Sequence, residues 1–226
     1  MKSIFNKYVT KDARDHTLLP PLTVSKKHKI LYFHIAKTGG SSIVKLLKNN
    51  GLDDGILSNK HGPYEDKLEY FQDVVDNWDD YYKFTFVRNK FDMLISLYNY
   101  DRQATGNPWT LSPEVTFEEF VRDHIGNPDT LKKQVLYTER IDQYYLTHTD
   151  DKCMFDFIGH FENFDRDLNT VCDKLGITNT QIRVNVGNYD RTKRHEYYTQ
   201  ELCGIVRESF PQEAAYFGWE DLGGEK

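Results

Sequence analysis

The chain has 226 residues, enough to bury a sizeable core, and one domain is the default expectation for this length. It carries 29 Lys and Arg against 35 Asp and Glu, which gives a formal net charge of −6. Because neutralising phosphates requires a surplus of basic residues, this balance argues against a general nucleic-acid or polyanion binder. Any anion site should therefore be local.

The three cysteines, Cys153, Cys172 and Cys203, show neither CxxC nor His-paired spacing. This pattern argues against a disulfide scaffold or a zinc site and fits a reducing compartment. The sequence contains no run of about 18 apolar residues that could span a membrane, and its N-terminal stretch has no signal-like apolar segment. We expect a soluble, cytoplasmic protein without a transmembrane segment.

Residues 1–28 are predicted to be a polar lead-in, and residues 29–226 a single domain. Within the domain, short β-branched and aromatic strands alternate with helical patterns. Such alternation predicts an α/β fold with a central parallel sheet and with ligands at the carboxyl ends of the strands. The fold class that we expect is a P-loop-type three-layer fold, in which helices flank this sheet. Three strand–helix units are expected, at residues 29–51, 81–103 and 153–177. Further helices are expected at residues 116–125, 131–146 and 198–210.

Several residues are expected to delimit these helices. Ser41 or Ser42 is a suitable N-cap for the first helix, and Asp92 for the second. Gly51 and Gly176 are expected to end the first and third helices, because glycine readily adopts the left-handed conformation of a C-cap.

The segment "HIAKTGGSS", residues 34–42, joins the first strand to its helix and has the composition of a phosphate- or sulfate-binding loop. Two glycines let the backbone curl, and the free N–H groups of the following helix would point into the curl. Ser41 and Ser42 add hydroxyl donors, and Lys37 adds a positive charge. The alternative is a tight turn with a surface lysine.

An ATP-binding Walker A loop would read G-x-x-x-x-G-K-[ST], with the lysine after the glycines. Here Lys37 precedes Gly39 and Gly40, and no strand ending in aspartate completes a metal site. The order disfavours ATP hydrolysis and predicts an anion site without a metal. A small-molecule or nucleotide kinase remains the alternative enzyme, and an anion-binding module without turnover the alternative non-enzyme.

The segments "FHIAKTGGSSI" and "FTFVRNKFDMLISLY" resemble the 5′-phosphosulfate loop and the 3′-phosphate segment of sulfotransferases that use 3′-phosphoadenosine 5′-phosphosulfate (PAPS). The resemblance extends over roughly residues 29–220, through "KHGPYEDKLEYF", "FIGHFENFDRDLNTVCDKLGI" and the terminal "YFGWE". It is closest to the carbohydrate branch that includes the heparan sulfate 2-O-sulfotransferases and small soluble bacterial relatives. It implies PAPS as cosubstrate and a sugar hydroxyl, on an oligosaccharide or glycolipid, as acceptor.

The resemblance also implies roles for individual residues. Lys37 would stabilise the charge that develops on the leaving phosphate oxygen, and Arg88 with Ser96 would bind the 3′-phosphate. The nucleotide ligands implied by the loop are Lys37, Thr38, Gly39, Gly40, Ser41 and Ser42. One departure is Lys90, where the family usually has proline; we expect it to loosen the turn before the helix and to add a charge near the anion.

A general base must remove the acceptor proton. Of the eight histidines, His61 lies in a loop between the first two strand–helix units, and the resemblance places the family's catalytic histidine there. The alternatives are a surface histidine at this position or Glu65 as the base. His34, within the first strand, is expected to be structural.

A basic, tyrosine-containing stretch at residues 188–198 stands out in an acidic protein. In the family, such a loop often closes over the nucleotide. Lys193 and Arg194 are therefore candidates for binding the 3′-phosphate or the acceptor, and a solvated charge run is the alternative.

Overall fold

The computed structural model describes residues 22–53, 56–57, 74–103, 111–112, 114–127, 141–178, 184 and 191–219. Contacts divide the chain into two compact units. Unit 1 comprises Met1–Val87 and Glu139–Val186, and unit 2 comprises Arg88–Thr138 and Gly187–Lys226.

Unit 1 is built on a five-stranded sheet with the strand order β3-β1-β2-β4-β7. Its strands are β1 (Leu22–Ser25), β2 (Ile30–Phe33), β3 (Ile56–Leu57), β4 (Tyr82–Val87) and β7 (Phe157–His160). The three predicted strands, β2, β4 and β7, are confirmed and run parallel, with Phe33 opposite Thr85 and Thr85 opposite Ile158. Their carboxyl ends therefore share one edge of the sheet.

Strand β1 runs antiparallel to both β2 and β3, so the sheet is mixed. It lies in the segment that the sequence analysis assigned to a polar lead-in. Leu22 and Val24 alternate with Thr23 and Ser25, yet all four side chains are buried. The strand is too short for its alternation to identify it in the sequence, and pairing with β2 determines its conformation.

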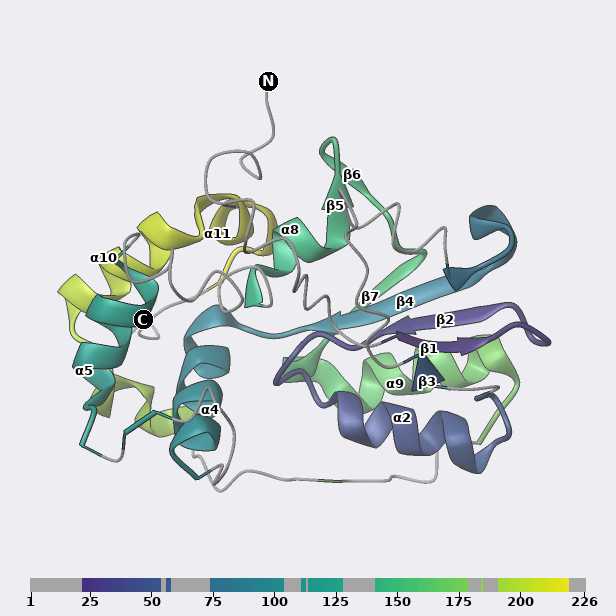
Figure 1. Ribbon diagram of the computed structural model, residues 1–226, viewed down its shortest axis with the longest axis horizontal. Coiled ribbons are helices and arrows are strands. Elements are labelled where there is room, and N and C mark those ends of the chain that lie inside the picture. Colours follow the sequence, from purple (N-terminus) through teal and green to yellow (C-terminus); the bar gives the residue numbers. More distant parts are fainter. Residues whose placement is uncertain are drawn as a thin grey trace. The chain divides into compact units, whose positions relative to one another are not determined.

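Two helices cover one face of this sheet, α2 (Gly40–Asn49) and α9 (Phe164–Leu175) (Figure 1). The side chains between them and the strands form one buried cluster: Ile30, Tyr32, Ile43, Leu46, Leu47, Leu52, Phe84, Phe86, Leu168, Val171 and Cys172. Gly176 ends α9 in the left-handed conformation, with φ +66°, as predicted. The remaining elements are η2 (Trp78–Asp80), α8 (Gln143–Thr147), β5 (His148–Thr149), β6 (Lys152–Cys153) and η4 (Phe161–Asn163), where η marks a helical turn other than α.

The start of α2 differs from the prediction. The helix begins at Gly40, and its N-cap is Gly39 in a left-handed conformation, with φ +85°. Ser41 and Ser42 therefore lie inside the first turn, so the prediction that one of them caps the helix was wrong. The helix does end before Gly51 (φ +66°), as predicted.

Unit 2 is mainly helical. Its elements are α4 (Lys90–Gln103), α5 (Phe117–Glu119), the π-helical turn η3 (Phe120–Ile125), η5 (Arg191–Glu196), α10 (Gln200–Ser209) and α11 (Pro211–Phe217). The predicted helices at residues 116–125 and 198–210 are thus confirmed. Of the helix predicted at 131–146, residues 131–140 lie outside the described chain, and α8 forms at its end.

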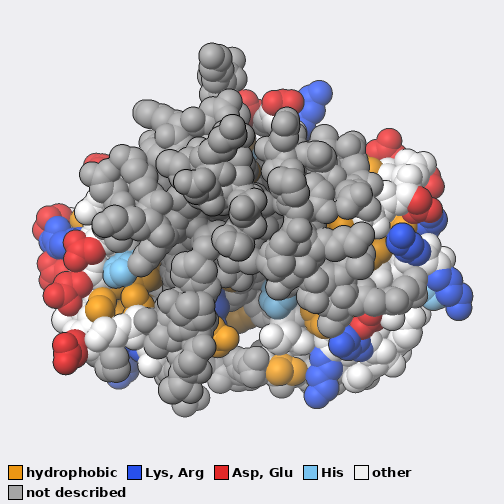
Figure 2. Space-filling model, viewed as in Figure 1, with side chains coloured by type: hydrophobic (Ala, Val, Ile, Leu, Met, Phe, Trp, Pro, Cys, Tyr) orange, Lys and Arg blue, Asp and Glu red, His pale blue; other side chains and the backbone are white. Residues whose placement is uncertain are grey.

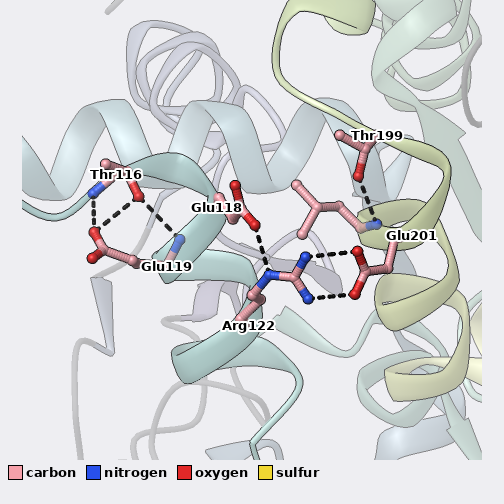
Figure 3. A network of polar contacts seen from close by, with 7 residues as sticks. Thr116, Glu118, Glu119, Arg122, Thr199 and Glu201 are labelled. Atoms are coloured by element: carbon pink, nitrogen blue, oxygen red, sulfur yellow. Dashed lines mark hydrogen bonds and ion pairs between the residues drawn. The ribbon is translucent and has the colours of Figure 1, made fainter.

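Polar contacts cap the start of α5 and join the π-helical turn η3 to the start of α10 (Figure 3). Thr116 and Glu119 form a capping box, in which each side chain accepts the other's backbone N–H. Arg122 donates to Glu118 at 2.8 Å and to Glu201 of α10 at 2.7 and 2.8 Å. These contacts fix the π-helical segment against α10.

At the start of α4 the cap is Asn89, whose side-chain oxygen accepts from the Phe91 backbone N–H at 3.0 Å. Asp92 is the third residue of the helix, so the prediction that Asp92 caps it was wrong. Asparagine is as good an N-cap as aspartate, and Asn89, three residues before Asp92, takes the role.

Lys90, the first residue of α4, is buried with only 2 % of its side chain exposed. Its ammonium forms a 2.9 Å ion pair with the fully buried Glu213 and lies 4.1 Å from the centroid of the Phe210 ring. The indole N–H of Trp219 donates to the other Glu213 oxygen at 3.0 Å. Glu213 thus neutralises the charge that we expected to add to the anion site.

We predict that Glu213→Gln lowers the free energy of unfolding by about 3–5 kcal/mol, because it leaves the Lys90 ammonium buried without a counter-charge. Urea denaturation monitored by circular dichroism measures the change. The matched control is Glu208→Gln, at an exposed position of α10, with an expected change within about 0.5 kcal/mol. Equal, small effects of both substitutions would show that the Lys90–Glu213 pair does not stabilise the fold.

Candidate active site

The loop between β2 and α2 has an unusual backbone. Lys37 and Gly39 both adopt left-handed conformations, with φ +64° and +85°. Left-handed geometry is unfavourable for a residue with a side chain, and such strain is concentrated at functional sites. Thr38, between them, is buried and donates its hydroxyl to the Ile35 carbonyl at 2.8 Å. Its hydroxyl hydrogen therefore stabilises the turn and is not available to a ligand.

The N-terminus of α2 opens directly onto this loop. The first turn contains no acidic residue, and no side chain in the described chain caps it. The N–H groups of Gly40 and Ser41, at the first two helical positions, have no acceptor within the helix. The Ser42 hydroxyl accepts from the Val184 backbone N–H at 2.9 Å, which leaves its own hydrogen for an anion. The donors and the helix dipole thus fit a phosphate- or sulfate-like group.

The two glycines are required by close packing. A Cβ atom at Gly40 would lie 2.0 Å from the His34 ring, and one at Gly39 would lie 2.8 Å from the Phe164 ring. No side-chain movement of a few tenths of an ångström relieves the first contact. The absence of a side chain at Gly40 therefore lets the loop lie close to the strand end.

His34 is a site residue whose role the sequence analysis missed. It directly follows β2, and its ring lies against Gly40 at the base of the loop. Burial, together with the nearby positive charge of Lys37, lowers the pKa of His34 to about 4, so the ring is neutral at pH 7. The available signal was its position three residues before Lys37.

The predicted 3′-phosphate residues lie in unit 2, around the start of α4. Arg88 is the first residue after β4 and is 7 % exposed, and Ser96 is half-buried on α4. Asp92 lies one helical turn before Ser96, on the same face of the helix. Arg88, Asp92 and Ser96 therefore recur at intervals of four residues.

Lys193 and Arg194, in η5 of unit 2, are in different surroundings. The Arg194 guanidinium binds both Asp92 carboxylate oxygens, with two hydrogen bonds of 2.9 Å. Lys193 is exposed, with its ammonium 3.8 Å from Glu196. Of the two predicted ligands, only Lys193 presents its charge at the surface.

The remaining predictions concern the base and the surface charge. His61 and the alternative base Glu65 lie outside the described residues, so their roles stay predictions. In the described chain, no group of three or more His, Cys, Asp or Glu side chains could hold a metal ion.

Figure 2 shows acidic side chains gathered over α5 and α10, where Glu114, Glu118, Glu119, Glu201 and Glu208 are exposed.

We predict that Gly40→Ala abolishes anion binding by the loop, because the added methyl group displaces either the His34 ring or the loop backbone. Thermal stabilisation by adenosine 3′,5′-bisphosphate (PAP), the product of PAPS, measures binding. The control is Gly204→Ala in α10, where a Cβ meets nothing within 4 Å. That control should bind normally and gain about 0.5–1 kcal/mol of stability. Normal binding by Gly40→Ala would contradict the close packing described above.

The lowered pKa of His34 predicts a pH-dependent stability. Between pH 6.5 and about 4 the unfolded chain protonates this histidine while the folded chain does not, so stability falls as the pH falls through this window. The loss amounts to up to about 3 kcal/mol. His34→Gln should remove this part of the slope in urea denaturation at pH 4.5, 5.5 and 6.5, whereas His195→Gln, at an exposed position, should keep it. Equal slopes in wild type and His34→Gln would be inconsistent with a neutral His34.

Comparison with known proteins gives one match. The family model described as "Sulfotransferase family" matches residues 20–212, which include the loop, β4, α4 and η5. No match was found among curated proteins or among solved structures. In the described residues, no helix is long and apolar enough to cross a membrane. Because the match covers most of the sequence, the chain belongs to the sulfotransferase family.

Proposed function

We propose that the chain transfers a sulfuryl group from PAPS to a hydroxyl group of a carbohydrate, on an oligosaccharide or a glycolipid. The observation that carries this proposal is the β2–α2 loop, where Lys37 and Gly39 adopt left-handed conformations in front of an uncapped helix N-terminus. A helix N-terminus preceded by a lysine suits the doubly charged phosphosulfate group. Members of the sulfotransferase family typically draw the sulfuryl group from PAPS.

The resemblance assigns residues to each charged end of the donor nucleotide. The loop residues Lys37, Thr38, Gly39, Gly40, Ser41 and Ser42 would bind the 5′-phosphosulfate, with Thr38 contributing its backbone alone. Arg88 and Ser96 would bind the 3′-phosphate, the arginine through a forked pair of donors and the serine through a neutral one. Lys193 and Arg194 are the further candidates near the 3′-phosphate or the acceptor.

The reaction would be an in-line displacement at sulfur. The acceptor oxygen forms a bond to sulfur and loses its proton to His61, while the bond between sulfur and the bridging phosphate oxygen breaks. The departing PAP keeps the electron pair of that bond, and Lys37 balances the negative charge that develops on the bridging oxygen. Stabilising charge that develops in the transition state is usually the largest single contribution to catalysis. The step as written needs no metal.

The carbohydrate acceptor rests on the resemblance to the carbohydrate branch. The net charge of the chain restricts which carbohydrates we propose as acceptors. With a net charge of −6 and exposed glutamates over α5 and α10, the protein attracts a densely sulfated chain only through a local basic surface. We therefore propose that the acceptor is a hydroxyl group on a neutral or weakly charged sugar.

The test is transfer of ³⁵S-labelled sulfate from PAPS across a panel of oligosaccharides, glycolipids and small alcohols. With the best acceptor, Lys37→Met should lower kcat about 10²–10³-fold, because it removes the charge beside the leaving oxygen. His61→Ala should lower kcat by about 10²–10⁴-fold while the Kd for PAP stays within about threefold of wild type.

The matched control is Lys45→Met, which removes an exposed lysine from the solvent side of α2 and should leave kcat unchanged. The proposal is overturned if wild type shows neither PAP-dependent thermal stabilisation nor transfer to any acceptor. Magnesium-dependent turnover of ATP would instead indicate a kinase. PAP binding without transfer would indicate an anion-binding module.

A further inference from the structure

The segment that contains η5 is docked on the first turn of α4. The Arg194 Nε and Nη2 atoms donate to the two Asp92 carboxylate oxygens, both at 2.9 Å. Four residues later, the Tyr198 hydroxyl donates to the Phe91 backbone carbonyl at 3.1 Å. Two side chains of one segment thus contact two successive residues of the helix, which fixes the segment in both position and orientation.

Aromatic packing supports the same arrangement. The Phe91 and Tyr198 rings meet edge to face, with centroids 5.2 Å apart, and Tyr198 packs in the same way against Phe117 at 4.9 Å. Both Tyr198 and Phe91 are almost fully buried. The docking is therefore part of the core of unit 2 and involves more than a surface ion pair.

Asp92 and Arg194 form a largely buried ion pair. The Asp92 side chain is 0 % exposed and that of Arg194 is 16 % exposed, so water screens their attraction only weakly. The planar guanidinium binds both carboxylate oxygens in a bidentate contact, which a lysine ammonium cannot form. An arginine whose charge is balanced by a buried carboxylate attracts a phosphate less strongly than an unbalanced one does. This geometry favours a positioning role for Arg194 over the role of a direct ligand.

The position of the pair indicates what it orients. Asp92 lies four residues after Arg88 and four residues before Ser96, which are the two residues proposed to bind the 3′-phosphate. Lys193 directly precedes Arg194 and presents its charge at the surface. A contact that fixes Asp92 therefore also fixes the helical turn between the two proposed ligands.

We propose that Asp92 and Arg194 are positioning residues that set the affinity for the 3′-phosphate of the donor nucleotide. The pair holds the first turn of α4 against η5, so that Arg88 and Ser96 are preorganised for the phosphate. This inference rests on the proposed function, because it assumes a nucleotide with a 3′-phosphate. It assigns Arg194 a role through Asp92 and leaves direct binding to Arg88 and Ser96.

The test compares the Kd values for PAP and for adenosine 5′-monophosphate (AMP), which share the 5′-phosphate and differ in the 3′-phosphate. Isothermal titration of the full chain gives both values, and their ratio isolates binding of the 3′-phosphate. We expect Asp92→Asn and Arg194→Gln each to reduce the preference for PAP over AMP about tenfold. The reason is that Arg88 and Ser96 bind the 3′-phosphate less well when they are displaced. The effects of the two substitutions should not add in the double variant, since both break the same contact. The Kd for AMP should stay within about twofold of wild type. A general loss of stability would weaken the binding of both nucleotides and leave the ratio of their Kd values unchanged.

Arg194→Lys separates positioning from direct binding. A lysine supplies a point charge to a phosphate but cannot bind both Asp92 oxygens, so positioning predicts the same loss as in Arg194→Gln. If Arg194 binds the phosphate directly, Arg194→Lys should keep most of the affinity, and Asp92→Asn should leave the ratio unchanged or raise it. Either result overturns the inference. Arg194 is partly exposed, so the lysine variant decides the question even if Asp92→Asn does not fold.

The control is Arg122→Gln, which breaks another bidentate arginine–carboxylate contact of unit 2, between Arg122 and Glu201. It should leave the ratio unchanged. If no variant changes the ratio, the pair is purely structural and the inference fails while the proposed function stands. If wild type itself binds PAP no better than AMP, then the proposed donor is wrong and the inference falls with it.

Discussion

The contact between His34 and Gly40 is the constraint on which the candidate site depends. It leaves no room for a methyl group, and it therefore fixes how closely the turn approaches the end of β2. In this turn Lys37 and Gly39 adopt left-handed conformations, and α2 begins at Gly40 without a side-chain cap. The same burial keeps His34 neutral at pH 7. A neutral ring adds no second positive charge beside Lys37.

Unit 2 depends on a different kind of interaction, namely buried pairs of opposite charge. Lys90 with Glu213 and Arg194 with Asp92 both connect the first turn of α4 to segments from the C-terminal part of the chain. A buried charge is costly unless its partner is in place, so each pair specifies where its segment docks. Both segments therefore have a defined position against the helix that carries Ser96.

Local features of the chain were predictable from the sequence. The three strand–helix units were predicted correctly because apolar periodicity and turn residues are properties of short windows. Gly51 and Gly176 end their helices as expected, since glycine is the residue that adopts their left-handed conformation without cost. The loop between β2 and α2 was also predictable, because the composition of its nine residues, 34–42, is a local property of the sequence.

Features that depend on distant residues were not predictable. Strand β1 becomes a strand by pairing with β2, and the pattern of its four residues did not reveal this. The role of His34 is visible only once the loop folds back onto the strand end. The partners of Lys90 and Arg194 are set by tertiary packing, so the buried pairs did not follow from local rules.

The loop at Lys37–Ser42 is proposed to bind the 5′ end of a 3′-phosphorylated adenine nucleotide through N–H, hydroxyl and ammonium donors of the protein. Calorimetric titration of the wild-type chain with PAP, in buffer containing a metal chelator, tests this binding. We expect saturable binding with one site per chain, a Kd that rises with ionic strength, and loss of binding in Gly40→Ala. The absence of binding in the chelator, with binding restored only by a divalent cation, would contradict this proposal.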